Sequence, residues 1–293
     1  MDAINSDDIV RRLLIEKCEA LENKLAGEVI MIRAPMAQGI DDVVRREIEN
    51  IASQDGCRNQ LVVVLETSGG SIEVVERISD VFRHHFEHVK FVIPNFAYSA
   101  GTVLTLSGDD ILMDYYSVLG PIDPQIKNRD DRWVPGLGYL EKYKELTTKP
   151  NITVSELEFL VRKFDAGELF ALEQAKEHSK KLIVRWLCDY KFKDWDRRET
   201  SGDEVDEDSK RERAEEIAEL LGDAKEWNSH GRGIPLRTLQ SDKVKLKITD
   251  FGADPDLNKA VREYYDLFID YCAKIGADVA VHTKRRLWAL GGG

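Results

Sequence analysis

Residues 61–114 decide the fold, because three short apolar runs alternate there with helical patterns. The runs are LVVVLE at 61–66, KFVIP at 90–94 and ILMD at 111–114. A continuous β-branched run is typical of a strand buried on both faces of a parallel sheet. Between the runs, apolar residues at three- and four-residue steps predict helices over 72–86 and from about residue 100. This alternation predicts βαβ units with right-handed crossovers in an α/β protein.

The pattern extends outward in both directions from this core. EVIMIRA at 28–34 predicts another strand, and a helix is expected over 41–53. An amphipathic helix over 7–26 needs a surface to cover, for which a neighbouring subunit is one candidate. Beyond residue 125 the chain reads as helical, with a long pattern over 154–190 interrupted at Gly167 and a last helix over 257–275.

Composition excludes several classes of protein. The 293 residues are 42% hydrophobic and 33% charged, which is typical of a globular protein. The 54 acidic and 42 basic residues give a net charge of −12, which argues against nucleic acid as a partner. Because no run of 18 apolar residues and no secretory leader is visible, neither a membrane span nor export is expected, and a cytoplasmic location is predicted.

Neither the cysteines nor the histidines form a metal-binding pattern. The four cysteines are scattered without ligand spacing and are expected to be free thiols in a reducing compartment. His84, His85 and His88 lie at the end of the helix expected after residue 72 and are interpreted as helix-end and surface residues. His178 and His282 lie in charged stretches that read as helical and are interpreted as surface residues. No metal or other cofactor is therefore predicted.

The first of three candidate functional segments is TSGGS at 67–71, directly after the strand at 61–66. Two glycines permit a tight turn that exposes backbone N–H groups at a helix N-terminus, where an anion or oxyanion would bind. A plain strand-to-helix turn is the alternative. The spacing is neither a dinucleotide-binding GxGxxG nor a phosphate-binding loop.

The second segment is FAYSAGT at 96–102, after the strand at 90–94. Ser99 lies among small residues at the head of an apolar helix, where an alkoxide would be stabilised and a substrate backbone could approach closely. An ordinary helix-capping serine is the alternative. The third segment, SVLGPIDPQ at 117–125, is a rigid loop that could form the rim of a cleft. All three segments follow predicted strands, at the sheet edge where open α/β folds bind ligands.

Taken together, ETSGGS, AYSAGT and LGPIDP in this order and spacing resemble the ClpP/SppA clan of serine peptidases. Within it they are most similar to the SppA-like serine dehydrogenase proteinase family. The resemblance covers about residues 27–145 and, more loosely, a Trp-x-x-His segment at 227–230. It implies a ClpP/crotonase-like fold of repeated β-β-α layers with added N-terminal and C-terminal helices. Ser68 stands where the family has a proline, which leaves both glycines in place.

The resemblance also implies roles for individual residues. Ser99 would be the nucleophile of a peptidase, and the backbone N–H groups of Gly69 or Gly70 and of Ala100 would form the oxyanion hole. The substrate cleft would be lined by four residues of the same segments: Ser71, Tyr98, Gly120 and Pro121.

The residue that activates Ser99 is less well defined. No histidine stands where ClpP-type enzymes carry theirs, whereas SppA-type enzymes use a lysine several tens of residues downstream of the serine. Lys142 lies at that distance and is the first candidate, with Lys144 in reserve. Burial would have to lower the lysine pKa from about 10.4 toward neutrality, so a solvent-facing lysine is the alternative. His230 is a further candidate, as an orienting group or base.

The sequence therefore predicts a peptidase domain over 27–252, flanked by an N-terminal helix over 1–26 and a C-terminal helical extension over 253–290. An acidic insert at about 194–216, with six acids at 199–208, is interpreted as a solvated loop. Expected partners are a peptide or protein substrate and further copies of the chain. Since no Walker motif is present, any ATP-driven unfolding must come from a separate ATPase or regulatory partner. Two alternatives stay open: a catalytically silent scaffold and a crotonase-type acyl-CoA enzyme.

Overall fold

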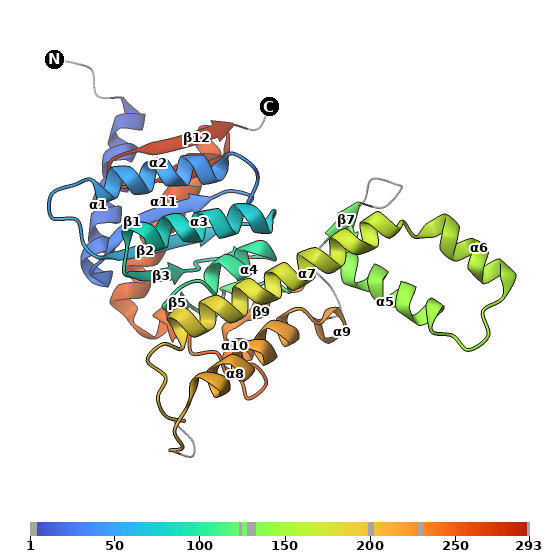
Figure 1. Ribbon diagram of the computed structural model, residues 1–293. Coiled ribbons are helices and arrows are strands. Elements are labelled where there is room, and N and C mark those ends of the chain that lie inside the picture. The colour runs from blue at the N-terminus through green and yellow to red at the C-terminus, as the bar shows by residue number, and fades with distance from the viewer. Residues whose placement is uncertain (1–4, 123–124, 128–132, 199–201, 228–230, 292–293) are drawn as a thin grey trace.

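The structure is a computed structural model that describes residues 5–122, 125–127, 133–198, 202–227 and 231–291. A central sheet carries helices on both faces, and a helical arm projects from one side of this body (Figure 1). No helix within the described residues is long and apolar enough to cross a membrane.

Seven strands form the central sheet in the order β10-β5-β3-β2-β1-β11-β12. Neighbours from β10 to β1 are parallel, whereas β11 joins β1 antiparallel and forms a hairpin with β12. The strands are β1 (Glu28–Arg33), β2 (Gln60–Glu66), β3 (His88–Val92), β5 (Asp110–Met113), β10 (Thr249–Asp250), β11 (Ala277–His282) and β12 (Leu287–Gly291). The strands predicted from residues 28–114 are thus confirmed.

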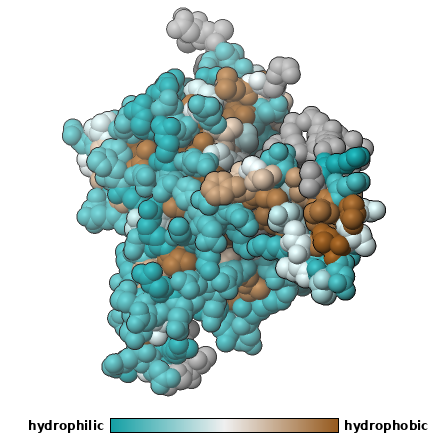
Figure 2. Space-filling view, turned by 45° about the vertical axis from the view of Figure 1, so that its right-hand side comes forward, coloured by the Kyte–Doolittle hydropathy of each residue, from teal (hydrophilic) through white to brown (hydrophobic). Residues whose placement is uncertain are grey.

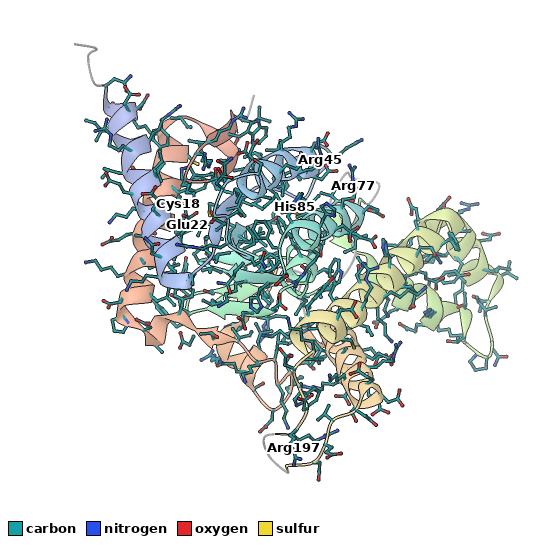
Figure 3. The ribbon with its side chains drawn as sticks, turned by 60° about the vertical axis from the view of Figure 1, so that its left-hand side comes forward. Cys18, Glu22, Arg45, Arg77, His85 and Arg197 are labelled. Carbon is teal, nitrogen blue, oxygen red and sulfur yellow. The ribbon has the colours of Figure 1, made fainter. Side chains whose placement is uncertain are left out.

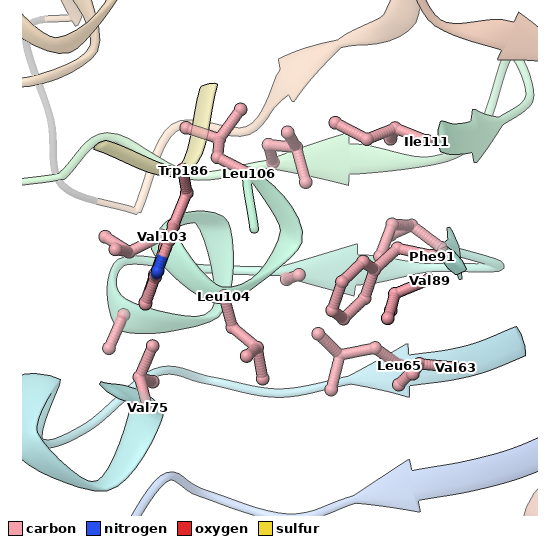
Figure 4. Packing of buried hydrophobic residues seen from close by; sticks show 14 of the residues in the cluster. Val63, Leu65, Val75, Val89, Phe91, Val103, Leu104, Leu106, Ile111 and Trp186 are labelled. Carbon is pink, nitrogen blue, oxygen red and sulfur yellow. The ribbon is translucent and has the colours of Figure 1, made fainter. Parts of the chain in front are cut away.

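Alternate side chains of each central strand pack on opposite faces of the sheet. Val63 and Leu65 point into the larger apolar cluster, with Phe91 and Leu104 (Figure 4), while Val62 and Val64 belong to the second cluster. This arrangement explains why the run at 61–66 shows no polar alternation, since both faces of the strand are buried. The larger cluster lies under α2 (Ile40–Ala52), α3 (Ile72–His85), α4 (Ala100–Thr105) and part of α7 (Ala166–Trp186).

The other face of the sheet is covered by α1 (Ser6–Leu25) and α11 (Pro255–Lys274). The two helices pack against each other, and the apolar side of α1, which includes Leu14 and Leu21, is fully buried. Cys18 and Glu22 project from α1 toward the body of the molecule (Figure 3). The expectation that this side of the N-terminal helix meets another subunit is therefore wrong, because α11 and the sheet of the same chain cover it.

The C-terminal region differs from the helical extension that the sequence predicts. After α11 the chain adds β11 and β12 to the sheet, joined by a turn in which Thr283 and Arg286 exchange backbone hydrogen bonds. His282, expected on the surface, is 3% exposed, and its Nδ1 lies 2.7 Å from the Tyr264 hydroxyl. The helical interpretation missed the short alternating run ADVAVH, which is typical of a strand.

The acidic segment is also more ordered than predicted. Its second half forms α8 (Glu207–Leu221), with Asp206 capping the N-terminus by accepting a hydrogen bond from the backbone of Ser209. Acidic residues in a first turn stabilise a helix because they face the positive end of its dipole. Ile217 and Leu221 are buried against the body, so the run of acids marks a helix start rather than a loop throughout.

The long helical pattern over 154–190 is interrupted just before Gly167. The chain breaks between α6 (Val154–Lys163) and α7, where Asp165 accepts hydrogen bonds from the backbone of Gly167 and Glu168. Gly167 thus lies in the first turn of α7. A five-residue π-helical turn, Leu187–Lys191, ends this region.

The helical arm consists of α5 (Gly136–Thr147), α6 and the N-terminal part of α7 (Figure 1). A hairpin of β7 (Gln125–Lys127) and β8 (Trp133–Pro135) precedes it. The arm has its own small apolar cluster, formed by Leu140, Leu169 and Leu172. Hydrophobic residues also gather at the surface on this side (Figure 2), where Ile152, Val154, Leu157, Phe159 and Phe170 are exposed.

Burial of His282 makes stability depend on pH. It lowers the pKa of His282 from 6.5 to about 4, because desolvation disfavours the charged ring. The unfolded chain therefore binds the extra proton first as pH falls. We expect the free energy of unfolding, from urea titrations, to fall by about 3 kcal/mol through this residue between pH 7 and 4. In His282→Gln this part of the pH dependence should disappear, whereas replacing the exposed His84 should leave it intact. Equal slopes in both variants would contradict the assignment.

Candidate active site

The three segments singled out in the sequence meet at the carboxyl edge of the parallel strands. The chain leaves β2 into the Gly69–Gly70 turn, and leaves β3 through β4 (Phe96–Ala97) to Ser99. From β5 it continues into β6 (Val118–Leu119), which pairs with β4 in parallel and with β9 (Ile234–Pro235) antiparallel. The alternation of strands and helices thus places all three segments side by side.

The Gly-Gly turn is held in place by Met36, which lies in the loop after β1. The Met36 N–H donates to the Gly69 carbonyl at 2.8 Å, and the Ser71 N–H donates to the Met36 carbonyl at 2.7 Å. Gly69 and Gly70 have φ values of +97° and +147°, which L-residues rarely adopt. Both glycines are therefore required by the backbone conformation of the turn.

Ser99 has a backbone conformation that is unusual for a residue with a side chain. Its φ is +51° and its ψ is −117°, directly before the first turn of α4. The side chain makes no capping hydrogen bond to α4, whereas Ser71 caps α3 by accepting from the Val74 N–H. Strain of this kind persists only where surrounding structure enforces it, and it is concentrated at functional sites. The helix-capping interpretation of Ser99 is therefore wrong.

Two backbone N–H groups of these segments have no partner among the described residues: that of Ala100, which follows Ser99 in the chain, and that of Gly70, which follows Gly69. Because Met36 bonds to the residues on either side of Gly70, the N–H of Gly70 itself points away from Met36. A Cβ on Gly69 would lie 2.9 Å from the Ser99 Cβ and 3.4 Å from the Ala100 nitrogen, so the turn and the serine are in direct contact. The arrangement provides donors for an oxyanion next to a serine hydroxyl.

We expect replacement of Gly69 by alanine to disrupt this contact. Its Cβ would lie 2.8 Å from the Tyr98 carbonyl oxygen and 2.9 Å from the Ser99 Cβ, so one backbone must move. A displacement of about 1 Å at a catalytic centre costs roughly 10²-fold in rate, which the rate of labelling by a fluorophosphonate would measure. Gly56→Ala is a matched control, since Gly56 also has a positive φ but an added Cβ would meet nothing within 4 Å. Equal labelling rates in the two variants would show that the contact is unimportant.

The third segment packs against the serine through Gly120. A Cβ there would lie 3.1 Å from the Ser99 nitrogen and 2.9 Å from the Tyr98 Cα. The buried Thr102 hydroxyl accepts from the Gly120 N–H at 2.9 Å and lies 2.8 Å from the Ala97 carbonyl oxygen. Thr102 therefore ties the start of α4 to both β4 and the Gly120 loop. Thr102 and Met36 were not identified from the sequence as positioning residues, although both lie in or beside the strand-end segments.

The residues predicted to line the cleft have different environments. Tyr98 is half-buried and stacks on Phe96, with 5.1 Å between ring centroids. Ser71 is half-buried, and its hydroxyl lies 2.5 Å from a carboxylate oxygen of Glu73. Gly120 and Pro121 are buried. Tyr98 directly precedes Ser99 in the chain, and Ser71 follows the Gly-Gly turn that contacts Ser99.

Neither candidate lysine is joined to Ser99 by a described contact. Lys142 is exposed on α5 of the helical arm, and its Nζ donates to Glu145 at 3.0 Å. Lys144, on the same helix, lies 3.8 Å from a carboxylate oxygen of Glu173 and is also exposed. The burial that a lysine base requires is absent around both side chains in this structure. His230 lies outside the described residues.

Residues 41–145 match the ClpP-like SDH-type serine proteinases. The matched stretch begins in α2 and ends in α5, and it contains the Gly-Gly turn, Ser99, the Gly120 loop and both candidate lysines. It confirms the resemblance indicated by the three motifs. The β-β-α layering expected of this fold is seen in β3–β4–α4, followed by the β5–β6 pair.

Similar proteins include two uncharacterized proteins of Methanocaldococcus jannaschii. One is 29% identical over 139 residues, covering 44% of this chain and 46% of the relative, and the other is 34% identical over 64 residues, 22% of each chain. This chain thus spans less than half the length of the curated relatives it matches. Among solved structures, two variants of the 1510-N membrane-bound stomatin-specific protease align with a TM-score of 0.44 and 14% identity. They cover 75% and 76% of this chain and 77% and 75% of theirs.

Proposed function

We propose that this protein is a serine peptidase that cleaves peptide bonds through an acyl-enzyme on Ser99. The observation that carries the proposal is the strained Ser99, whose side chain does not cap α4, in contact with the Gly-Gly turn, where the N–H groups of Gly70 and Ala100 have no partner among the described residues. A nucleophile and an oxyanion hole require this juxtaposition. The family match over residues 41–145 supports the same reaction class.

The proposed reaction follows from these positions. The Ser99 oxygen attacks the scissile carbonyl carbon while its proton passes to a base, and the carbonyl oxygen becomes an oxyanion that accepts hydrogen bonds from Gly70 and Ala100. Collapse of this intermediate breaks the C–N bond, and the base returns its proton to the leaving amine. Water then attacks the ester on Ser99 in the same way and releases the acid product.

Lys142 is the proposed base, with Lys144 in reserve. Its position on the helical arm means that the arm must bring the lysine to a Ser99 hydroxyl and exclude water there. Desolvation lowers the pKa of a lysine, and a neutral amine can accept the serine proton. The exposed apolar residues of the arm, among them Val154 and Phe170, support its docking on another surface. We infer that the active form is a homo-oligomer.

The proposed substrate is an extended peptide or protein segment in the cleft beside Ser99. Ser71 and Tyr98 would contact it on one side, and the Gly120–Pro121 segment would form the other wall. Substrates that are folded would need a separate ATPase or regulatory protein to unfold them, and a cytoplasmic location would suit such a partner.

A catalytically silent scaffold is the second candidate, and the exposed position of Lys142 favours it. A fluorophosphonate probe distinguishes the two functions, because it phosphonylates only a serine that can be deprotonated beside an oxyanion hole. We expect the assembled protein to be labelled, and digestion with mass spectrometry should place the label on the peptide that contains Ser99. A folded, assembled protein that takes no label would favour the scaffold. Binding of CoA without any labelling would favour acyl-CoA chemistry.

A further inference from the structure

A pocket lies between α1 and the β11–β12 hairpin, on elements outside the three segments of the Ser99 site. Its volume is about 320 Å³, within the range of small-molecule sites. Residues from both elements line it: Arg11, Leu14, Ile15, His282, Arg285, Arg286 and Leu287. Three arginines thus line one pocket in a chain whose net charge is −12.

The arginines are only partly neutralised by neighbouring acids. The guanidinium of Arg285 makes no ion pair or hydrogen bond with the residues that the structure describes. Arg11 donates to the neutral hydroxyl of Tyr271 at 3.1 Å, and Asp7 and Asp8 affect it only at longer range. Arg286 lies 3.7 Å from the buried Glu47. The pocket therefore keeps an excess of positive charge.

Lys284, in the same turn, differs from Arg285 because its charge is neutralised by acidic side chains. Its Nζ donates to Glu22 at 3.0 Å and to Glu28 at 2.8 Å. The contrast with Arg285 indicates that the basic run 284–286 is divided: the lysine fastens the hairpin to α1 and β1, while the arginines face the pocket.

The buried His282 contributes an imidazole ring to the lining of the pocket. Its ring is almost completely buried yet lines the pocket, and its Nδ1 is paired with the Tyr264 hydroxyl at 2.7 Å. Within the described part of the chain, no hydrogen bond uses its Nε2. In the tautomer in which the Tyr264 hydroxyl donates to Nδ1, the neutral ring carries its proton on Nε2, from which it can donate to an acceptor in the pocket.

We propose that this pocket binds the phosphate group of a small phosphorylated metabolite. Arginine guanidinium groups match phosphate oxygens through paired hydrogen bonds, and a phosphate monoester carries nearly two negative charges to balance the excess. The volume exceeds that of phosphate alone and leaves room for a small organic part beside Leu14 and Leu287. The site is separate from Ser99 and does not depend on the peptidase proposal.

Calorimetric titration of the full chain with glucose 6-phosphate and with inorganic phosphate, at matched ionic strength, tests this. We expect one site that binds glucose 6-phosphate more tightly than phosphate. Arg285→Gln should weaken binding at least about tenfold, since a charge-assisted hydrogen bond is lost. The fold should survive, because the Arg285 guanidinium has no partner among the described residues. Arg12→Gln removes the same charge from an exposed position on α1, outside the pocket lining. This variant should bind glucose 6-phosphate like the wild type.

Three results would overturn the proposal. The first is no binding heat for either phosphate compound, and the second is equal weakening by Arg285→Gln and Arg12→Gln, which would show only general charge attraction. The third is equal or tighter binding of succinate, which would assign the pocket to dicarboxylates instead. Thermal unfolding of each variant without ligand checks that the fold is intact.

Discussion

Replacing Ser99 with alanine should abolish both peptidase turnover and fluorophosphonate labelling. Removal of the nucleophile from a serine peptidase costs roughly 10⁴-fold or more in kcat, because the acyl-enzyme cannot form. The fold should remain, since the Ser99 side chain caps no helix and α4 is held by its buried apolar residues, such as Val103 and Leu104. Turnover of a fluorogenic peptide and labelling intensity measure the two effects.

Ser53→Ala is the matched control for this substitution. Ser53 is exposed at the end of α2, outside the three segments, and its hydroxyl donates to the Asn50 carbonyl. This variant should keep full turnover and labelling. If Ser99→Ala kept its label while the protein remained folded, another serine would be the nucleophile, and the arrangement around Gly70 and Ala100 would need a different explanation.

The core and the three segments could be predicted because the information is local. The run at 61–66 is buried on both faces, so it is apolar throughout, and the neighbouring helices show one apolar side each. Parallel strands then place every strand-end segment at one edge, whatever the details of packing. The contact between Gly69 and Ser99 follows from that topology. Its closeness could come only from the structure, in which a Cβ added to Gly69 would lie 2.9 Å from the Ser99 Cβ.

The features that the sequence missed depend on long-range packing. Met36 acts through its backbone, so its side chain gives no sign that it holds the Gly-Gly turn. His282 was assigned to the surface because charged residues surround it, yet the strand alternation of β11 buries it under Tyr264. The acids at 203–208 were interpreted as a solvated loop, although acids before an apolar stripe also start helices, as Asp206 does for α8.

The position of a base is harder still to predict from spacing. Lys142 lies at the sequence distance expected of an SppA-type lysine. Distance along the chain, however, does not determine whether the helix that carries the lysine packs against the body of the protein or belongs to the arm. In this structure its helix is part of the projecting arm, and Glu145 holds the ammonium in solvent. A catalytic lysine there would be formed by assembly or by movement of the arm, rather than by the fold of the body alone.

We expect Lys142→Ala to lower acylation of Ser99 by about 10²–10⁴-fold, the usual contribution of a general base. Lys149→Ala is the matched control, since Lys149 lies just after the end of α5 and, like Lys142, is exposed and paired with a carboxylate, here Glu156 at 2.9 Å. It should label like the wild type. If Lys144→Ala is inactive and Lys142→Ala is active, the reserve residue is the base. If both keep full activity, the Ser–Lys dyad is wrong.

Mixing the two inactive variants decides how the arm supplies its lysine. In an oligomer in which the arm of one copy serves the Ser99 of another, Ser99→Ala and Lys142→Ala subunits together form some sites with both groups intact. Peptidase activity should then return after the variants are unfolded and refolded together, and not after either is refolded alone. If each arm serves its own Ser99, no mixed assembly contains an intact site and activity stays absent. The exposed apolar residues of the arm, such as Val154 and Phe170, favour the first result, because exposed apolar patches mark surfaces that bind another surface.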